Sequence, residues 1–303
     1  DFARAMDADH CVSCANGTDA IYIALVALGL KPGDEVIVPA MTWISTASAV
    51  ARVGARPEFA DIHPLSYTLN PSLVEAAVTD RTKALIPVHL YGLMADMPEL
   101  LTIAKRHGLY VIEDAAQAHG ASLNGRNAGT WGHAATFSFF PSKNLGAFGD
   151  AGCVVTNDEG LAEEVRRLTN HGQRVKHVFE RLGRNSRMDG IQASVLSVKL
   201  PHLASWTQAR RDVATAYLSG LTDSGHHSLP REPAGHRHVY HLFVIESRER
   251  SQLVRRLREG GVGFGHHYPT KLWEVAALGA AGPMAFPVAK RVVEHGVSLP
   301  MFP

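Results

Sequence analysis

Apolar and polar positions alternate regularly along the first two thirds of the chain. Short runs rich in Val, Ile and other apolar residues predict buried strands, and the amphipathic segments between them predict helices. The predicted strands are residues 10–15, 35–39, 56–61, 83–89, 109–114, 135–140 and 153–155, and the predicted helices are residues 20–28, 44–53, 72–78 and 97–107. Strands and helices that alternate across short turns indicate an α/β fold, with a large, mostly parallel sheet flanked by helices.

The last third of the chain predicts a second, smaller α+β unit. A helix expected at 188–200 ends the first unit. The expected elements of the second unit are helices at 204–221 and 249–259, a polar loop at 225–237, and strands at 239–246 and 262–267. We therefore expect a large domain at residues 1–203 and a small C-terminal domain at residues 204–303. We also expect both termini to be truncated, because residues 1–6 resemble the end of a helix and no closing helix follows residues 299–303.

Candidate ligand-binding residues follow the predicted strands. Ligands of open α/β sheets bind beyond the carboxyl ends of the strands. Asn16, Gly17 and Thr18 separate the first predicted strand from the first predicted helix, and free N–H groups at a helix N-terminus bind phosphate. The alternative is a simple N-cap at Asn16 or Thr18. Trp43 follows the second predicted strand, where its ring could stack on a planar ligand or belong to the core.

Asp114 ends a nearly continuous apolar strand. A buried carboxylate is unfavourable unless a cation or hydrogen bonds compensate it, and a protonated pyridine nitrogen would be such a cation. Gln117 could donate a hydrogen bond to a hydroxyl group on the same ring. The alternative for Asp114 is a helix N-cap, because Ala115-Ala116-Gln117 follows it. His119 either packs beside such a ring or is an ordinary core histidine.

Lys143 lies in a loop of small residues between the predicted strands 135–140 and 153–155. Glycines around a lysine let a flat ligand approach the backbone. An amine among mostly apolar neighbours shifts toward its neutral, nucleophilic form, which Schiff-base chemistry with a carbonyl cofactor requires. The alternative is a surface lysine on a hairpin.

Composition narrows the class of protein. The chain has 303 residues, of which 46% are hydrophobic and 19% are charged, so it can bury a large core. The net charge of +1 indicates neither a nucleic-acid nor a membrane partner, and no apolar run is long enough to span a bilayer. Three cysteines are too few for a disulfide framework, so we expect a cytoplasmic enzyme.

Neither the cysteines nor the histidines predict a metal site. Cys11 and Cys14 have no second pair, and their spacing on a strand points them to opposite faces. Several histidines cluster in the C-terminal region, but no carboxylate or cysteine joins them at the spacing of metal ligands. These histidines are His236, His238, His241, His266 and His267.

Six motifs in order give the sequence a family resemblance. They are NGTDA at 16–20, PGDEVIVPAMTW at 32–43, PVHLYG at 87–92, EDAAQAHGA at 113–121, FSFFPSKNLGAFGDAGCVVTND at 137–158 and GRNSRMDGIQA at 183–193. With these motifs the chain resembles the DegT/DnrJ/EryC1/StrS family of sugar aminotransferases over nearly its whole length. These are pyridoxal-phosphate enzymes of the aspartate-aminotransferase fold, which is fold type I.

The resemblance implies a role for each residue that matches a motif. Lys143 would bind pyridoxal 5'-phosphate covalently and act in catalysis. Asp114 would hold the pyridine nitrogen protonated, Gln117 would bond the ring hydroxyl, and Trp43 would stack on the ring. Gly17, Thr18 and Ser138 would bind the phosphate. Across a homodimer interface, Asn185 would reach the partner's phosphate and Arg187 would lie near the substrate, which His119 could also contact.

One residue departs from the pattern of the family. The position before Asn185 is often aromatic or aliphatic in the family, and here it is Arg184. Arg184 could add a contact to the phosphate or extend into solvent, and we expect the latter. The Asn-Ser-Arg form resembles members that act on deoxy-sugar nucleotides.

The resemblance also implies the reaction. An amino group would pass from L-glutamate or glutamine to a keto sugar, expected to be a nucleotide-linked keto-deoxysugar. Alternatives are a keto-cyclitol aminotransferase of aminoglycoside biosynthesis and a non-catalytic regulatory or binding protein of the same fold. A sugar dehydratase of the same family is disfavoured, because that branch has histidine at the position of Lys143.

Overall fold

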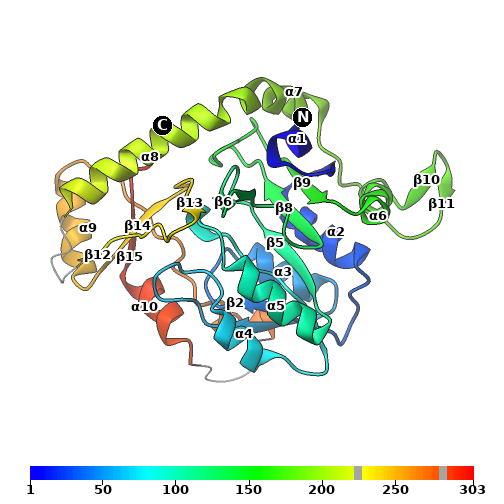
Figure 1. Ribbon diagram of the computed structural model, residues 1–303, viewed down its shortest axis with the longest axis horizontal. Helices are drawn as coiled ribbons and strands as arrows, with labels where there is room; N and C mark the ends of the chain where they lie inside the picture. Colours follow the sequence, from blue (N-terminus) through cyan, green and yellow to red (C-terminus); the bar gives the residue numbers. More distant parts are fainter. Residues whose placement is uncertain (222–226, 280–284) are drawn as a thin grey trace.

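A seven-stranded sheet forms the centre of the molecule, as the computed structural model of the chain shows for residues 1–221, 227–279 and 285–303 (Figure 1). In spatial order its strands are β1 (His10–Cys14), β9 (Gly152–Thr156), β8 (Ala134–Ser138), β5 (Tyr110–Asp114), β4 (Thr82–Leu85), β2 (Glu35–Pro39) and β3 (Arg56–Ala60). Within this sheet only β9 runs opposite to the others, since it pairs antiparallel with both β1 and β8. The mostly parallel sheet flanked by helices is therefore confirmed.

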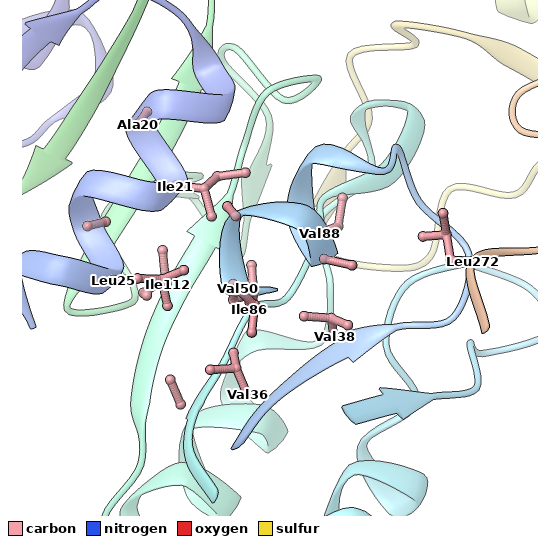
Figure 2. Close-up of a cluster of buried hydrophobic side chains, with 14 of the residues drawn as sticks. Ala20, Ile21, Leu25, Val36, Val38, Val50, Ile86, Val88, Ile112 and Leu272 are labelled. Carbon is pink, nitrogen blue, oxygen red and sulfur yellow. The ribbon is translucent and has the colours of Figure 1, made fainter. Parts of the chain in front are cut away.

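Helices cover both faces of this sheet, because neighbouring residues of each strand point to opposite sides. Val36 and Val38 of β2 pack in the core on the side of α2 (Gly17–Ala27) and α3 (Ser45–Arg52) (Figure 2). Ile37, between them, packs in the core on the other side. The remaining helices of the first 200 residues are α1 (Phe2–Met6), α4 (Pro71–Ala77), α5 (Met97–His107), α6 (Glu159–Thr169) and α7 (Gly190–Lys199).

The C-terminal region has a smaller sheet in the order β12 (His227–Ser228), β14 (Phe243–Ser247) and β15 (Gly296–Leu299). The long helix α8 (Leu203–Gly220) leads from α7 to this sheet (Figure 1). The helices α9 (Arg250–Glu259) and α10 (Pro287–His295) belong to the same region. The division of the chain after residue 203 remains our proposal.

Short elements complete the description. They are the strands β6 (Ser122–Leu123), β7 (Arg126–Asn127), β10 (Gln173–Val175), β11 (Val178–Phe179) and β13 (His236–Arg237), and the 3-10 helices η1 (Leu90–Gly92), η2 (Leu200–His202), η3 (Leu272–Glu274) and η4 (Ala276–Leu278). The strand β13 pairs with β6, so the C-terminal region also contributes to a sheet of the N-terminal part. Leu272 and Phe286 likewise pack into the core on the α2 side of the central sheet.

Several expected elements differ from those observed. The strand predicted at 262–267 is wrong: only an isolated bridge joins Gly265 to Ser298. The partner strand β15 and the helices α6 and α10 were not predicted from the sequence. The loop predicted at 225–237 begins outside the described residues, and its described part contains β12 and β13. These segments become ordered through contacts with distant parts of the chain. The local sequence pattern does not reveal such contacts.

None of the helices in the described ranges combines the length and the apolar character needed to cross a lipid bilayer.

Candidate active site

A cavity of about 670 Å³ lies at the carboxyl edge of the central sheet. Because β1, β2, β5 and β8 run in the same direction, the segments that follow them meet at this edge. The sequence-predicted residues that line the cavity are Gly17, Thr18, Trp43, Asp114, Gln117, Ser138 and Lys143. The structure therefore brings together residues that are up to 126 positions apart in the sequence.

The N-terminus of α2 forms one end of the cavity. Asn16 is the N-cap, and its side-chain oxygen accepts a hydrogen bond from the backbone N–H of Asp19 at 2.8 Å. A Cβ atom added at Gly17 would lie 2.6 Å from the Cβ of Ser138, so only glycine fits here. The hydroxyls of Thr18 and Ser45 lie 2.7 Å apart beside this terminus. Backbone N–H groups and hydroxyls at a helix N-terminus are suited to bind a phosphate.

Asp114 lies at the end of β5 and is 5% exposed. Its carboxylate accepts hydrogen bonds from the Thr46 hydroxyl at 2.8 Å and from the Ala116 N–H at 3.2 Å. Burial raises the pKa of Asp114, and these bonds and the Lys143 amine offset the effect only in part. No helix begins after Asp114, so the N-cap alternative is wrong. The carboxylate is therefore suited to pair with a further cation in the cavity.

Gln117 and Trp43 flank the cavity together with Tyr268. The side-chain amide of Gln117 donates a hydrogen bond to the Tyr268 hydroxyl at 2.6 Å, and its oxygen accepts one from the Tyr91 N–H at 2.7 Å. The rings of Trp43 and Tyr268 lie 5.4 Å apart, and Trp43 is 57% exposed. Trp43 is thus not a core tryptophan, and its ring is free to contact a planar ligand.

Lys143 lines the same cavity as Asp114, and the two side chains interact electrostatically. Burial lowers the pKa of Lys143 from 10.5 to about 8, against the opposing effect of the Asp114 carboxylate. The next residue, Asn144, is buried and anchors the loop, because its amide donates to the Val239 carbonyl at 3.0 Å and its oxygen lies 3.0 Å from His241 Nδ1. A lysine with a lowered pKa on an anchored loop is suited to nucleophilic and proton-transfer chemistry.

Asn185 and Arg187 do not line this cavity in the single chain. Both are exposed, and Arg187 donates a hydrogen bond to Asn170 at 2.9 Å. Arg184 is neither in the cavity nor free in solvent. Its guanidinium lies 3.4 Å from Asp19 and 4.7 Å from the centre of the Tyr22 ring.

His119 is also outside the cavity. It is fully buried against the aromatic rings of Phe2, Phe137 and Phe139, and neither of its ring nitrogens has a hydrogen-bond partner. Burial lowers its pKa to about 3. The core-histidine alternative matches this position.

Sequence reasoning missed several residues of the site. Ser45 and Thr46 lie two and three positions after Trp43, and their hydroxyls are a local signal that could have been noticed. Tyr268 and His241 come from the C-terminal region, and nothing in their local sequence connects them to Lys143. The structure also adds Arg52, Asp150 and His267 to the lining of the cavity.

The chain is similar to known proteins over its whole length. A model described as the DegT/DnrJ/EryC1/StrS aminotransferase family matches residues 1–303. The pleiotropic regulatory protein of Geobacillus stearothermophilus is 48% identical, over 100% of this chain and 82% of its own length. The UDP-N-acetyl-3-dehydro-alpha-D-glucosamine 3-aminotransferase of Acidithiobacillus ferrooxidans is 47% identical, over 97% of this chain and 79% of its own length.

A comparison with solved structures also finds a similar protein. The crystal structure of S. venezuelae DesV in complex with a ketimine intermediate has a TM-score of 0.97 to this chain at 45% identity. The match covers 99% of this chain and 82% of that one.

Proposed function

The chain belongs to the DegT/DnrJ/EryC1/StrS aminotransferase family, and on this premise we propose that it transfers an amino group to a keto sugar linked to a nucleotide. It is a pyridoxal-phosphate-dependent aminotransferase. The observation that carries the proposal is the convergence of Lys143, Asp114 and Gln117 on one cavity that also receives the N-terminus of α2. A binding protein would have no need of an amine with a lowered pKa at that place.

The residues of the cavity fit pyridoxal phosphate. Asp114 would pair with the pyridine nitrogen, because its raised pKa marks a carboxylate whose partners within the chain are insufficient. The N–H groups at Gly17 and Thr18, with the Ser138 hydroxyl, would bind the phosphate at the N-terminus of α2, where the missing side chain of Gly17 lets Ser138 approach the helix closely. We propose that Gln117 bonds the ring hydroxyl and that Trp43 covers a face of the ring.

The chain's own contribution to the reaction is proton transfer. When bound, pyridoxal phosphate supplies a ring that withdraws the electrons released when a proton leaves the carbon bearing the amino group. Nζ of Lys143 accepts that proton, since its pKa of about 8 leaves a neutral amine available near neutral pH. Asp114 keeps positive charge on the ring nitrogen, which stabilises the negative charge that develops.

We propose L-glutamate or glutamine as the amino donor and a nucleotide-linked keto-deoxysugar as the acceptor. The A. ferrooxidans relative is named for a UDP-linked amino sugar, which favours this acceptor over a keto-cyclitol. A comparison of turnover on keto-sugar nucleotides and on keto-cyclitols, with glutamate and with glutamine, decides between the acceptors and identifies the donor.

We further propose a homodimer with shared active sites. Asn185 and Arg187 are exposed, so a second subunit could use them. Large apolar side chains are also exposed on α7, the helix that follows them in the chain, and beside it: Ile191 and Val198 of α7 are 75% and 71% exposed, and Phe148, which contacts Gln192, is 77% exposed. A concentration of exposed apolar residues favours a protein interface.

The low cysteine content remains the reason for our proposal of a cytoplasmic location.

Absorbance spectroscopy of the purified protein tests the function. Wild-type protein incubated with pyridoxal phosphate should retain the yellow absorbance of a lysine-bound cofactor after gel filtration, and glutamate should bleach it. Lys143→Ala should lose this absorbance, while Lys105→Ala, which removes an exposed lysine of α5, should keep it.

A non-catalytic regulator is the alternative that the name of the G. stearothermophilus relative suggests. If wild-type protein retains no cofactor and turns over no keto acceptor, the aminotransferase proposal is wrong and the regulator takes its place.

A further inference from the structure

A second cavity, of about 480 Å³, lies between the loop before α4 and the C-terminal sheet. It shares no lining residue with the candidate active site. Pro64, Leu65 and Tyr67 form one side. The other side is formed by β12, β14 and α10 and by the residues that follow β12 and β14. It is therefore a separate site, built from distant parts of the chain.

The charged lining of this cavity is mainly cationic. The lining contains three arginines, Arg231, Arg248 and Arg291. Among its described residues, Glu246 is the one carboxylate. Arg291 pairs with Glu246 through two contacts, Nε to Oε2 at 2.7 Å and Nη2 to Oε1 at 3.2 Å. The Tyr67 hydroxyl donates a third hydrogen bond to Glu246 Oε1 at 2.8 Å. Glu246 is thus engaged by Arg291 and Tyr67.

Arg231 and Arg248 have no such partner in the part of the chain that the structure describes. Both are exposed, and no acidic side chain within the described ranges lies in salt-bridge distance of either. Two guanidinium groups that line one cavity without an acidic partner among the described residues attract an anion, and guanidinium groups match phosphate through paired N–H donors. The Ser228 hydroxyl on the same lining adds a further hydrogen-bonding group.

Part of the lining is apolar. Pro64, Leu65 and Leu229 contribute to it, and Leu65 is 52% exposed. An apolar wall beside a cationic one is suited to a ligand with an anionic end and a less polar body. The volume is in the range of cavities that hold small organic ligands, which exceeds the needs of an inorganic ion.

We propose that this cavity binds a phosphate-bearing ligand of nucleotide size, with its phosphates on Arg231 and Arg248. The apolar wall contacts the remainder of the ligand. This site is independent of the aminotransferase reaction, because it requires neither Lys143 nor pyridoxal phosphate.

Arginine modification mapped by mass spectrometry tests the proposal residue by residue. Full-length protein reconstituted with pyridoxal phosphate is treated with phenylglyoxal, with and without millimolar UDP as the probe. UDP should protect Arg231 and Arg248 in a saturable way and leave Arg255, an exposed arginine of α9, unprotected. Arg52 lines the candidate active site, so its labelling reports separately on UDP bound there.

Variants and a second probe sharpen the test. Arg248→Ala should weaken UDP protection of Arg231 about tenfold, the loss expected for one charge-assisted hydrogen bond, and Arg255→Ala should not. Inorganic pyrophosphate should protect more weakly than UDP because it cannot use the apolar wall. Absence of protection by UDP, or equal protection by pyrophosphate, overturns the proposal. Neither result bears on the aminotransferase activity, which is read from the cofactor spectrum.

Discussion

Two neighbouring carboxylates at the end of β5 differ sharply in their environment. Glu113 is fully buried, and its oxygens lie 2.9 Å from His89 Nε2 and accept hydrogen bonds from the backbone N–H groups of Gly129, Trp131 and Gly132 at 2.8–2.9 Å. Burial alone would raise the pKa of Glu113, but these bonds keep it lowered. Asp114 has fewer partners and a raised pKa. We therefore propose that Glu113 stabilises the fold and that Asp114 interacts with the cofactor.

Asp114→Asn should reduce turnover at least about a hundredfold, because the ring nitrogen loses the anion that keeps it protonated. Without cofactor, its free energy of unfolding in urea should stay within about 1 kcal/mol of wild type, since the carboxylate is poorly compensated in the fold. The stabilisation by added pyridoxal phosphate should fall by about 2 kcal/mol.

Glu113→Gln is the matched control for Asp114→Asn. It should lower the free energy of unfolding by about 2 kcal/mol or more with or without cofactor, because its buried donors lose their charged acceptor. If both variants respond to cofactor alike, the assignment of Asp114 to the cofactor is wrong.

The reactivity of Lys143 should depend on pH around its lowered pKa. The neutral amine is the reactive form, so trace acetylation by acetic anhydride should rise about tenfold per pH unit below a pH of about 8 and level off above it. Peptide mapping of protein without cofactor gives the profile, with Lys105 in the same sample as a control for the reagent. A midpoint near the ordinary value of 10.5 would contradict the effect of burial.

At the scale of elements, the start of β9 and the end of β8 hold the N-terminus of α2 in place. A Cβ atom at Gly152, the first residue of β9, would lie 2.4 Å from the backbone carbon of Asn16. Gly17 has equally little space against Ser138. The close approach of three backbone segments therefore shapes the proposed phosphate site, and the antiparallel direction of β9 brings its first residue to this edge.

Gly17→Ala should weaken the retention of pyridoxal phosphate at least about tenfold, since an overpacked contact costs about 1–3 kcal/mol and displaces the N–H groups of α2. The dissociation constant can be measured by fluorescence titration. Gly190→Ala is the matched control, because Gly190 also begins a helix and nothing lies within 4 Å of its added Cβ. Equal affinity in Gly17→Ala and wild type would remove Gly17 from the proposed phosphate site.

At the scale of the whole molecule, the exposed apolar residues around α7 raise the question of assembly. Ile191 and Val198 are seven positions apart on α7 and so share one face of the helix. Phe148 lies beside them, because its N–H donates to Gln192 of the same helix at 2.9 Å. The β10–β11 hairpin, with Phe179 61% exposed, projects from the body of the molecule (Figure 1).

Ile191→Glu combined with Val198→Glu should convert the proposed dimer into monomers and reduce cofactor retention, because each site would lose Asn185 of the partner subunit. Light scattering after gel filtration measures the mass. Leu73→Glu, at a partly exposed leucine of α4, should leave the mass unchanged. A dimer that survives the double substitution would show that another surface mediates the contact.

Local pattern was sufficient for most of the central sheet and for much of the site. Apolar runs predicted the strands correctly because a strand buried on both faces consists mostly of apolar residues. The candidates Gly17, Trp43, Asp114 and Lys143 were identified because each lies at or after the end of such a run. The resemblance to a family added Asn185 and Arg187, whose spacing alone carried no signal. By contrast, β15 depends on its pairing with β14, at least 50 positions earlier, and the contact of Tyr268 with Gln117 joins residues 151 positions apart.

The sequence by itself thus determined the fold class and the family, and it predicted Lys143 as the reactive lysine and Asp114 as its carboxylate, because these inferences follow from local periodicity and from contiguous motifs. Only the tertiary structure decided which residues share a cavity. It excluded His119 from the cavity, added Tyr268 and His241 to the lining, paired Arg184 with Asp19, and placed the Thr46 hydroxyl against Asp114. The physical reason is that burial, pKa and hydrogen-bond partners arise from contacts between distant segments, and these contacts exist only after the sheet and its helices have packed.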